Sequence, residues 1–509
     1  MSNRLPVDRI VADDGSEGWK VSPGGLVTAL EPVMRSSDGA WVGWAGQPDL
    51  ELDPFDYDGM RLVPVQLSKR DVEQYYEGFS NDTIWPLYHD VIAPPTYHRV
   101  WWDRYVAVNR RFADAVLDIV EADGTVWVQD YQLQLVPQML REARPDLTIG
   151  FFNHIPFPPY GIFAQLPWRK EILEGLLGAD VIGFQRQSDA SGFARAVRHI
   201  LGHVTTPTIE VPVADDDAAA TGRSKKGRTV RRVLAKAFPI SIDAEQYAEM
   251  ARRPDIQARA KQIRQELGNP TTIMLGVDRL DYTKGIRHRI KAFGELIADG
   301  ALEVGEVTLV QVASPSRERV ETYRQLRDEI ELSVGRLNGD HGTMEHAPIN
   351  YLHHGYPREE MVALYLAADV MLVTALRDGM NLVAKEYVAS RNDERGVLVL
   401  SEFAGAADEL KQALLINPHD IVGLKRAIVH AAGMEPREQQ RRMRALRKRV
   451  LEHDVARWSS SFLTALAATR HPEQVPAVLP EPESGPGAEA VADTSSTADE
   501  TAVERGTAS

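Results

Sequence analysis

The sequence predicts an α/β protein built on parallel β-sheets, because short apolar runs alternate with segments of helical periodicity along most of the chain. The alternation is regular between about residues 270 and 417, and less regular between residues 126 and 184. Continuous apolar strands of this kind are typical of parallel sheets that helices cover on both faces. A chain of 509 residues exceeds one core of ordinary size, so we expect two domains.

The first half of the chain contains three short apolar runs that we interpret as buried strands. A polar residue follows each run, namely Asp130, His154 or Gln185. A further strand at residues 236–240 ends in a linker, so we expect the first domain to span residues 1–240. The three expected strands are residues 126–128, 149–152 and 181–184.

The more regular alternation lies in residues 241–454, which are expected to form the second domain. Polar residues follow its strands on the side where an open parallel sheet binds ligands. They are Arg279, Lys284, Arg317, Tyr356 and Asp378. The expected strands are residues 273–277, 307–312, 349–352, 370–373, 397–400 and 414–416, with helices that include residues 286–296, 319–334 and 358–367.

Several segments lie outside this alternation. Residues 215–228 are interpreted as a mobile surface loop, and residues 455–468 as an amphipathic closing helix. Residues 471–509 hold eight acidic residues against Arg505 alone, so we expect a disordered tail whose deletion changes neither activity nor melting temperature. The chain begins almost directly at Arg4, which suggests a natural start further upstream and an Arg4 on a frayed end.

Composition restricts the class of partner. A net charge of −15 argues against nucleic acid as a partner. Salt screens this net charge over short distances, so Arg and Lys within a site can still bind anions. The absence of cysteine excludes disulfides and thiolate metal sites, and no apolar run reaches the length needed to cross a membrane. We therefore expect a soluble cytoplasmic protein with small-molecule partners; a homo-oligomer remains open.

The segment 370–386 is the most informative in the chain. An apolar run is followed by the turn Arg377-Asp378-Gly379 and then by good helix formers. The start of a helix directs free N–H groups toward its surroundings, and an anion such as a diphosphate suits that place. Glu386, a turn or two further on, could hold the cis-diol of a ribose. An ordinary turn with a solvated acid is the alternative.

A second motif, at residues 273–285, follows the same design. Arg279 and Lys284 leave the end of a strand on a short loop that opens a helix. Two cations there would neutralise a leaving pair of phosphates, and an arginine can do so with a bidentate fork. A pair of surface salt-bridge residues is the simpler alternative, but two such loops in one domain favour the phosphate site.

These motifs resemble the trehalose-6-phosphate synthase family of retaining glycosyltransferases, from about residue 2 to residue 468. The resemblance implies two Rossmann-like domains that face each other across a cleft, the GT-B type, with the closing helix crossing back to the first domain. The matching runs are Tyr75-Tyr76-x-x-Phe79-Ser80-Asn81 with Trp85-Pro86, Trp127-Val128-Gln129-Asp130-Tyr131, Gly150 to Pro158, Arg279 to Gly285 and Arg377 to Glu386.

The resemblance also implies residue roles. It assigns catalysis to Arg279, Lys284, His154 and Asp378. Donor nucleotide-sugar binding is assigned to Gly24, Gly25, Arg279, Lys284, Tyr356, Asp378, Met380, Asn381, Leu382, Val383 and Glu386. Acceptor binding is assigned to Arg4, Trp41, Tyr76, Trp85, Asp130 and Arg317.

Some of these assignments have alternatives in the sequence itself, and one residue departs from the pattern of the family. Trp41 and Trp44 cannot be separated, and one of them is expected only to pack. His154 could be a structural turn residue ahead of the run Ile-Pro-Phe-Pro. Asn153 departs from the apolar residue expected before this histidine, which bears on the detail of the donor pocket.

The implied reaction moves glucose from a nucleoside diphosphate glucose (UDP-, ADP- or GDP-glucose) to glucose 6-phosphate, with retention. The product would be α,α-trehalose 6-phosphate, the first intermediate of trehalose biosynthesis. The sequence shows no opposed pair of carboxylates of the kind that a glycosidase uses. We expect neither a cofactor nor an obligatory metal. The alternatives are a sister transferase with another acceptor, such as glycerol 3-phosphate or a cyclitol phosphate, and a non-catalytic sugar-phosphate sensor.

Overall fold

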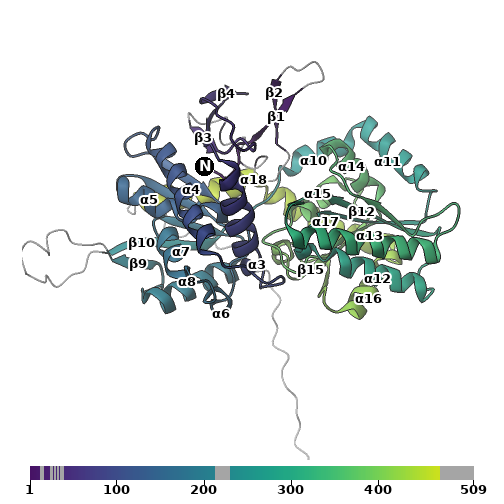
Figure 1. Ribbon diagram of the computed structural model, residues 1–509. Helices are drawn as coiled ribbons and strands as arrows, with labels where there is room; N and C mark the ends of the chain where they lie inside the picture. Colours follow the sequence, from purple (N-terminus) through teal and green to yellow (C-terminus); the bar gives the residue numbers. More distant parts are fainter. Residues whose placement is uncertain are drawn as a thin grey trace, which may run out of the picture. The chain divides into compact units, whose positions relative to one another are not determined.

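The computed structural model describes residues 1–11, 17–22, 27, 30, 34, 39–212 and 230–470. Residues Met1–Arg470 form one compact unit (Figure 1). The glycine pair Gly24 and Gly25, the expected surface loop at residues 215–228 and the acidic tail at residues 471–509 lie outside the described residues. Within the described residues, no helix is both long and apolar enough to cross a membrane.

A five-stranded sheet organises the first half of the chain. Its strand order is β6-β7-β8-β10-β9, and only β9 runs antiparallel to its neighbour. The central strands β7 and β8 are buried along their whole length, as expected of parallel strands covered on both faces. The strands are β6 (Thr125–Gln129), β7 (Thr148–Phe152), β8 (Val181–Phe184), β9 (Ile209–Pro212) and β10 (Val230–Ala237).

The last helix of the described chain, α18 (Val455–Arg470), packs against β7 and β8 (Figure 1). The ring of Phe462 stacks on Trp127 with centroids 4.5 Å apart. Gly150 and Gly183 make room for this contact, because a Cβ at either position would lie within 3.0 Å of Phe462. Of the helices beside this sheet, α5 (Val136–Ala143) and α8 (Gln187–Leu201) contact its strands, and α4 (Arg99–Leu117) and α7 (Arg169–Leu176) pack against α5.

The N-terminal residues are tied to the protein rather than frayed, which corrects the expectation for Arg4. The carbonyl of Met1 accepts from the N–H of Gln129 at 3.0 Å, and the N–H of Leu5 donates to Trp44 at 2.8 Å. The strands that follow are β1 (Val7–Val11), β2 (Glu17–Val21), β3 (Ala40–Gly43), β4 (Phe55–Tyr57) and β5 (Met60–Pro64).

A six-stranded, fully parallel sheet organises the second half, with the order β13-β12-β11-β14-β15-β16. Counted from β11, this is the doubly wound order 3-2-1-4-5-6, whose direction of winding reverses between β11 and β14. The strands are β11 (Thr272–Arg279), β12 (Val307–Ser314), β13 (Ile349–Leu352), β14 (Val370–Val373), β15 (Val397–Ser401) and β16 (Leu414–Ile416).

Two groups of helices accompany this sheet (Figure 1). One group contains α12 (Ile286–Ala298), α13 (Glu321–His341) and α16 (Ile421–Ala432). The other contains α10 (Ala244–Arg252), α11 (Pro254–Glu266), α14 (Arg358–Ala367), α15 (Leu382–Ser390) and α17 (Pro436–Glu452). Because α12 and α15 belong to different groups, the loops after β11 and β14 diverge, and ligands bind at this edge of doubly wound sheets.

Candidate active site

Lys284 and Asp378 form an ion pair across the point where the winding reverses. Lys284 ends the short helix η3 (Tyr282–Lys284) after β11, and Asp378 lies in the turn after β14. The Nζ atom of Lys284 donates to Oδ2 of Asp378 at 2.6 Å. Burial would raise the pKa of Asp378, but the ammonium of Lys284 outweighs it and the pKa is lowered. Asp378 is therefore ionised at neutral pH.

The helix α15 begins directly behind this pair. Asn381 adopts φ +78°, and its side-chain oxygen caps the helix by accepting from the N–H of Ala384 at 3.1 Å. Asparagine is one of the few residues that tolerate this left-handed conformation. Leu382 and Val383 form the first turn, so their backbone N–H groups face this edge of the sheet, whereas the Met380 side chain is buried in the core.

Glu386 lies one turn into α15 and accepts a hydrogen bond from the hydroxyl of Tyr365 at 2.8 Å. Burial raises its pKa, and Tyr247 and Tyr365 act against that rise. Tyr356 is half-buried beyond β13, which is the edge strand two positions from β11. The assignment of Tyr356 to the donor residues stays a prediction.

Arg317 is the centre of a second cluster. Its side chain is only 6% exposed, and its guanidinium carbon lies 3.9 Å from the ring centroid of Trp85. It donates to Oδ2 of Asp281 at 3.2 Å and to the hydroxyl of Tyr131 at 3.3 Å. Tyr131 follows the first sheet and Asp281 the second, so this arginine joins residues from both sheets. Arg279 also approaches Trp85, at 5.6 Å.

Trp44 lies beside two of the other acceptor residues. The guanidinium of Arg4 lies 5.1 Å from the Trp44 ring, and the Tyr76 ring lies 6.2 Å from it. Both tryptophans are buried, and the indole N–H of Trp41 donates to Oγ of Ser2 at 2.8 Å. They lie three residues apart, so only their packing separates them. The assignment of Trp41 to the acceptor pocket stays a prediction, with Trp44 beside it.

Asp130 and His154 lie together at the ends of β6 and β7. The carboxylate of Asp130 accepts from the backbone N–H of His154 at 3.0 Å, and burial raises the pKa of Asp130 to about 6. Nε2 of His154 is 2.8 Å from Oε1 of Gln129. Burial lowers the pKa of His154 to about 3, so its imidazole is neutral at physiological pH and can act only as a neutral hydrogen-bonding group.

The turn after β14 touches the first sheet's loops directly at Gly379. A Cβ at this position would lie 2.2 Å from the carbonyl oxygen of His154. Glycine is therefore required for the close approach, a role that the motif alone did not reveal.

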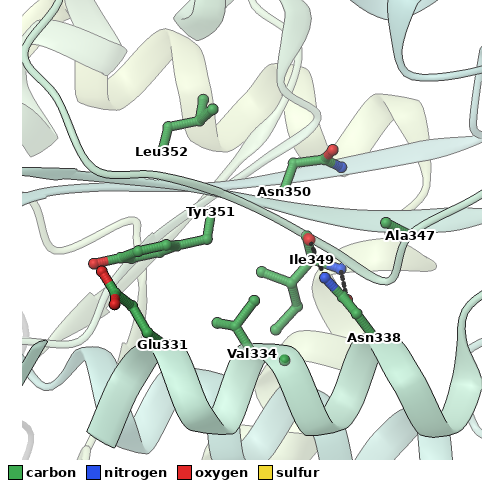
Figure 2. Close-up of a pocket in the computed structure, with 9 residues that line it drawn as sticks. Glu331, Val334, Asn338, Ala347, Ile349, Asn350, Tyr351 and Leu352 are labelled. Carbon is green, nitrogen blue, oxygen red and sulfur yellow. Dashed lines mark hydrogen bonds between the residues drawn. The ribbon is translucent and has the colours of Figure 1, made fainter. Parts of the chain in front are cut away.

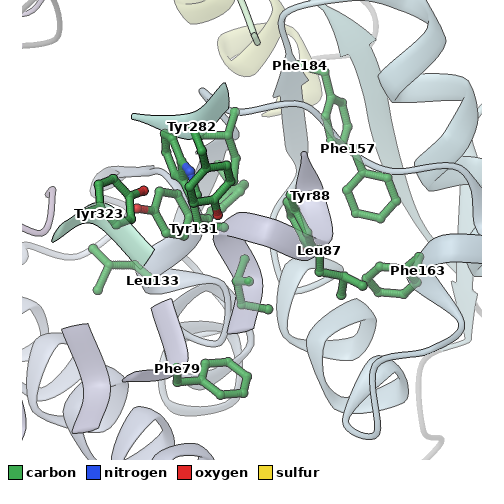
Figure 3. Close-up of a cluster of buried hydrophobic side chains, with 14 of the residues drawn as sticks. Phe79, Leu87, Tyr88, Tyr131, Leu133, Phe157, Phe163, Phe184, Tyr282 and Tyr323 are labelled. Carbon is green, nitrogen blue, oxygen red and sulfur yellow. The ribbon is translucent and has the colours of Figure 1, made fainter. Parts of the chain in front are cut away.

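Four buried polar residues near the cluster were missed by sequence reasoning: His89, Asn81, Tyr131 and Asp281. The His89 ring lies 4.2 Å from that of Trp85, and burial lowers its pKa to about 4. Tyr131 and Tyr323 belong to a buried aromatic cluster at this place (Figure 3). The signal in the sequence was that Asn81, Tyr131 and Asp281 stand inside the matching motifs.

A separate groove of about 470 Å³ lies between α13 and the edge strand β13 (Figure 2). Asn338 binds both the N–H and the carbonyl of Ile349 there, at 3.0 Å and 2.9 Å. None of the sequence-predicted site residues lines this groove. We therefore place the candidate site at the two charged clusters.

A family model described as glycosyltransferase family 20 matches residues 1–468. The chain is 57% identical over 477 residues to a trehalose-6-phosphate synthase of Mycolicibacterium gilvum (strain PYR-GCK), with 92% of this chain and 93% of the relative covered. The corresponding Mycolicibacterium smegmatis protein is 56% identical over 473 residues, with 92% of each chain covered.

Solved structures are also similar. An alpha,alpha-trehalose-phosphate synthase (UDP-forming) from Burkholderia xenovorans, in complex with glucose-6-phosphate, has a TM-score of 0.79 and 33% identity, and covers 88% of this chain and 97% of its own. An E. coli structure bound with UDP-2-fluoro glucose has a TM-score of 0.78 and 32% identity, with the same coverage.

Proposed function

Because the chain belongs to glycosyltransferase family 20 and has its GT-B fold, we propose that it transfers glucose from UDP-glucose to glucose 6-phosphate. The products are UDP and α,α-trehalose 6-phosphate. One observation carries this proposal beyond the family: a cluster around Lys284 and a cluster around Arg317 meet at the carboxyl edges of the two sheets. Each cluster supplies the cation that one anionic substrate requires.

The Lys284 cluster suits the diphosphate of the donor. Arg279 and Lys284 supply positive charge, and the first turn of α15 supplies backbone N–H groups. Glu386 lies further along the same helix, where its carboxylate binds the ribose hydroxyls. Gly24 and Gly25 remain proposed donor residues on the strength of the resemblance, together with Met380, Asn381, Leu382 and Val383, while Tyr356 has the weakest support.

The Arg317 cluster suits the phosphate and ring of the acceptor. Arg317 binds the phosphate with help from Tyr76 and Arg4, and Trp85 and Trp44 provide apolar faces for the sugar. Asp130 accepts a hydrogen bond from an acceptor hydroxyl. We propose that residues 1–240, closed by residues 455–468, form the acceptor domain and residues 241–454 the donor domain.

The reaction needs stabilisation of the charge that develops on the leaving diphosphate. Arg279, Lys284 and the start of α15 stabilise that charge in a partly buried place, where electrostatic interactions are stronger than in water. A leaving phosphate oxygen takes the proton of the attacking acceptor hydroxyl, on the face from which UDP departs, and this gives retention. The neutral imidazole of His154 and the carboxylate of Asp378 position the transferred glucose. A cytoplasmic location, where phosphorylated sugars are found, belongs to the same proposal.

Incubation with UDP-, ADP- or GDP-glucose and glucose 6-phosphate, followed by NMR identification of the products, tests the proposal. We expect α,α-trehalose 6-phosphate and UDP in equal amounts, with UDP-glucose as the preferred donor. Reactions with glycerol 3-phosphate or a cyclitol phosphate test the sister-transferase alternative. The proposal fails if glucose is transferred to one of those acceptors instead, or if the folded protein only binds glucose 6-phosphate.

A further inference from the structure

Asp281 is a buried carboxylate whose two oxygens are both used as acceptors. Its Oδ1 accepts from the backbone N–H of Thr283 at 2.9 Å. Its Oδ2 accepts from Nη1 of Arg317 at 3.2 Å and from the hydroxyl of Tyr323 at 3.1 Å. All three neighbours are donors, so a group with two acceptor oxygens is required at this position.

The guanidinium of Arg317 is fixed on its other sides as well. The Trp85 ring covers one face at 3.9 Å, and Nη2 donates to the hydroxyl of Tyr131, which in turn donates to Asn81 at 2.8 Å. The Tyr323 ring centroid lies 5.4 Å from the guanidinium. Tyr282 packs on Tyr323, with ring centroids 5.4 Å apart (Figure 3). The backbone of Arg317 adopts φ +49°, a conformation that is uncommon for a residue other than glycine and is characteristic of functional positions.

We propose that Asp281 is a positioning residue that orients Arg317 for the acceptor phosphate and so connects acceptor binding to the loop that carries Arg279 and Lys284. This inference rests on the proposed function. A buried ion pair is a poor device for stability alone, because desolvation offsets much of its attraction. Asp281 remains ionised in this setting: burial opposes the charge, but Arg317, Lys284 and Arg279 hold its pKa at about 2.

The substitution Asp281→Asn distinguishes orientation of Arg317 from competition for it, because the two predict opposite changes in the KM for glucose 6-phosphate. An amide keeps the shape but replaces one acceptor oxygen with an NH2 group, which must then face a donor. We expect the KM for glucose 6-phosphate to rise about tenfold or more, with the affinity for UDP changed less than about threefold. If the carboxylate merely competed with the acceptor phosphate for Arg317, the same variant would lower this KM, and that result overturns the inference.

A double-mutant cycle tests whether Asp281 acts through Arg317. In the Arg317→Ala background, Asp281→Asn should raise the acceptor KM no further. Additive increases overturn the inference. Asp278→Asn is the matched control, since Asp278 lies three residues before Asp281, in β11, and makes a buried ion pair with Arg289 at 2.7 Å. The Asp278→Asn control should lower the melting temperature without raising the acceptor KM selectively over the affinity for UDP. A selective rise as large as that of Asp281→Asn overturns the inference.

Tyr323→Phe provides a second variant that keeps the ring and removes a hydroxyl that donates to Asp281 and accepts from Arg317. It should raise the acceptor KM severalfold and leave UDP affinity unchanged, whether or not Asp281→Asn folds. An unchanged acceptor KM in this variant overturns the inference. The proposed function still stands in that case if the wild-type protein is active. A wild-type protein that is inert toward glucose 6-phosphate overturns both.

Discussion

The ammonium of Lys284 lies 2.6 Å from the carboxylate of Asp378, and this pair joins the loops after β11 and β14. Their side chains are 11% and 14% exposed, so the pair is partly shielded from water. Asn381 donates a further hydrogen bond to Asp378 at 3.2 Å. Lys284 is thereby held beside the start of α15, where a diphosphate would meet both the ammonium and the helix N–H groups.

Lys284→Ala should reduce turnover about 100- to 1000-fold, because the charge that Lys284 stabilises grows in the transition state. Acceptor binding should change little. Steady-state kinetics with UDP-glucose, together with calorimetry of glucose 6-phosphate binding, checks both statements. A variant with near-normal kcat would remove Lys284 from the diphosphate site.

Arg317→Ala should raise the apparent KM for glucose 6-phosphate about ten- to a hundredfold and leave UDP binding intact, because a charge-assisted contact to a phosphate is lost. Calorimetry with UDP and with glucose 6-phosphate measures the two affinities separately. Loss of UDP binding with normal binding of the sugar phosphate would reverse the two pockets.

The activity should depend on the ionisation of Asp130, whose pKa burial raises to about 6. Because the carboxylate form binds the acceptor hydroxyl, kcat/KM should fall as the pH drops below 6. The substrate phosphate also titrates near pH 6, so the wild-type profile should approach a slope of about two protons in acid.

Asp130→Asn should have lower activity and a slope of about one proton. Asp189→Asn is the matched control, since burial also raises the pKa of Asp189 to about 6. It should keep the steeper profile. Equal slopes for wild type and Asp130→Asn would contradict the role of Asp130.

Gly379→Ala should lower both the melting temperature and the activity, because its Cβ would lie 2.2 Å from the carbonyl oxygen of His154. Gly335→Ala in α13 is the control: a Cβ there meets no described atom within 4 Å, and replacing a helix glycine stabilises by about 0.5–1 kcal/mol. Thermal unfolding and kcat/KM, measured for both variants, test this prediction. A Gly379→Ala protein that matched wild type would show that the two loops can separate freely.

Much of the fold could be predicted from the sequence because buried parallel strands are continuous apolar runs. The positions of Arg279, Lys284 and Asp378 followed from the same signal, since each comes just after such a run. Boundaries were less exact: the strand expected at residues 236–240 is β10 and ends at Ala237. Tertiary pairing, rather than local pattern, sets where a strand ends.

Contacts between distant polar residues could not be predicted. Trp41 and Trp44 are both buried but belong to different core clusters, and a three-residue spacing does not decide which of them reaches the site. Asp281 and Tyr131 come together across the two sheets through Arg317, and no periodicity encodes that meeting. His89 follows Trp85 by one helical turn, but its burial depends on the whole cluster.

A crystal structure with UDP and glucose 6-phosphate bound together tests the central claim most directly, namely that the two charged clusters hold the two substrates at one site. We predict that the diphosphate lies against Arg279, Lys284 and the start of α15, and that the sugar phosphate contacts Arg317. The account is contradicted if the two ligands exchange these places, or if either one binds away from both clusters.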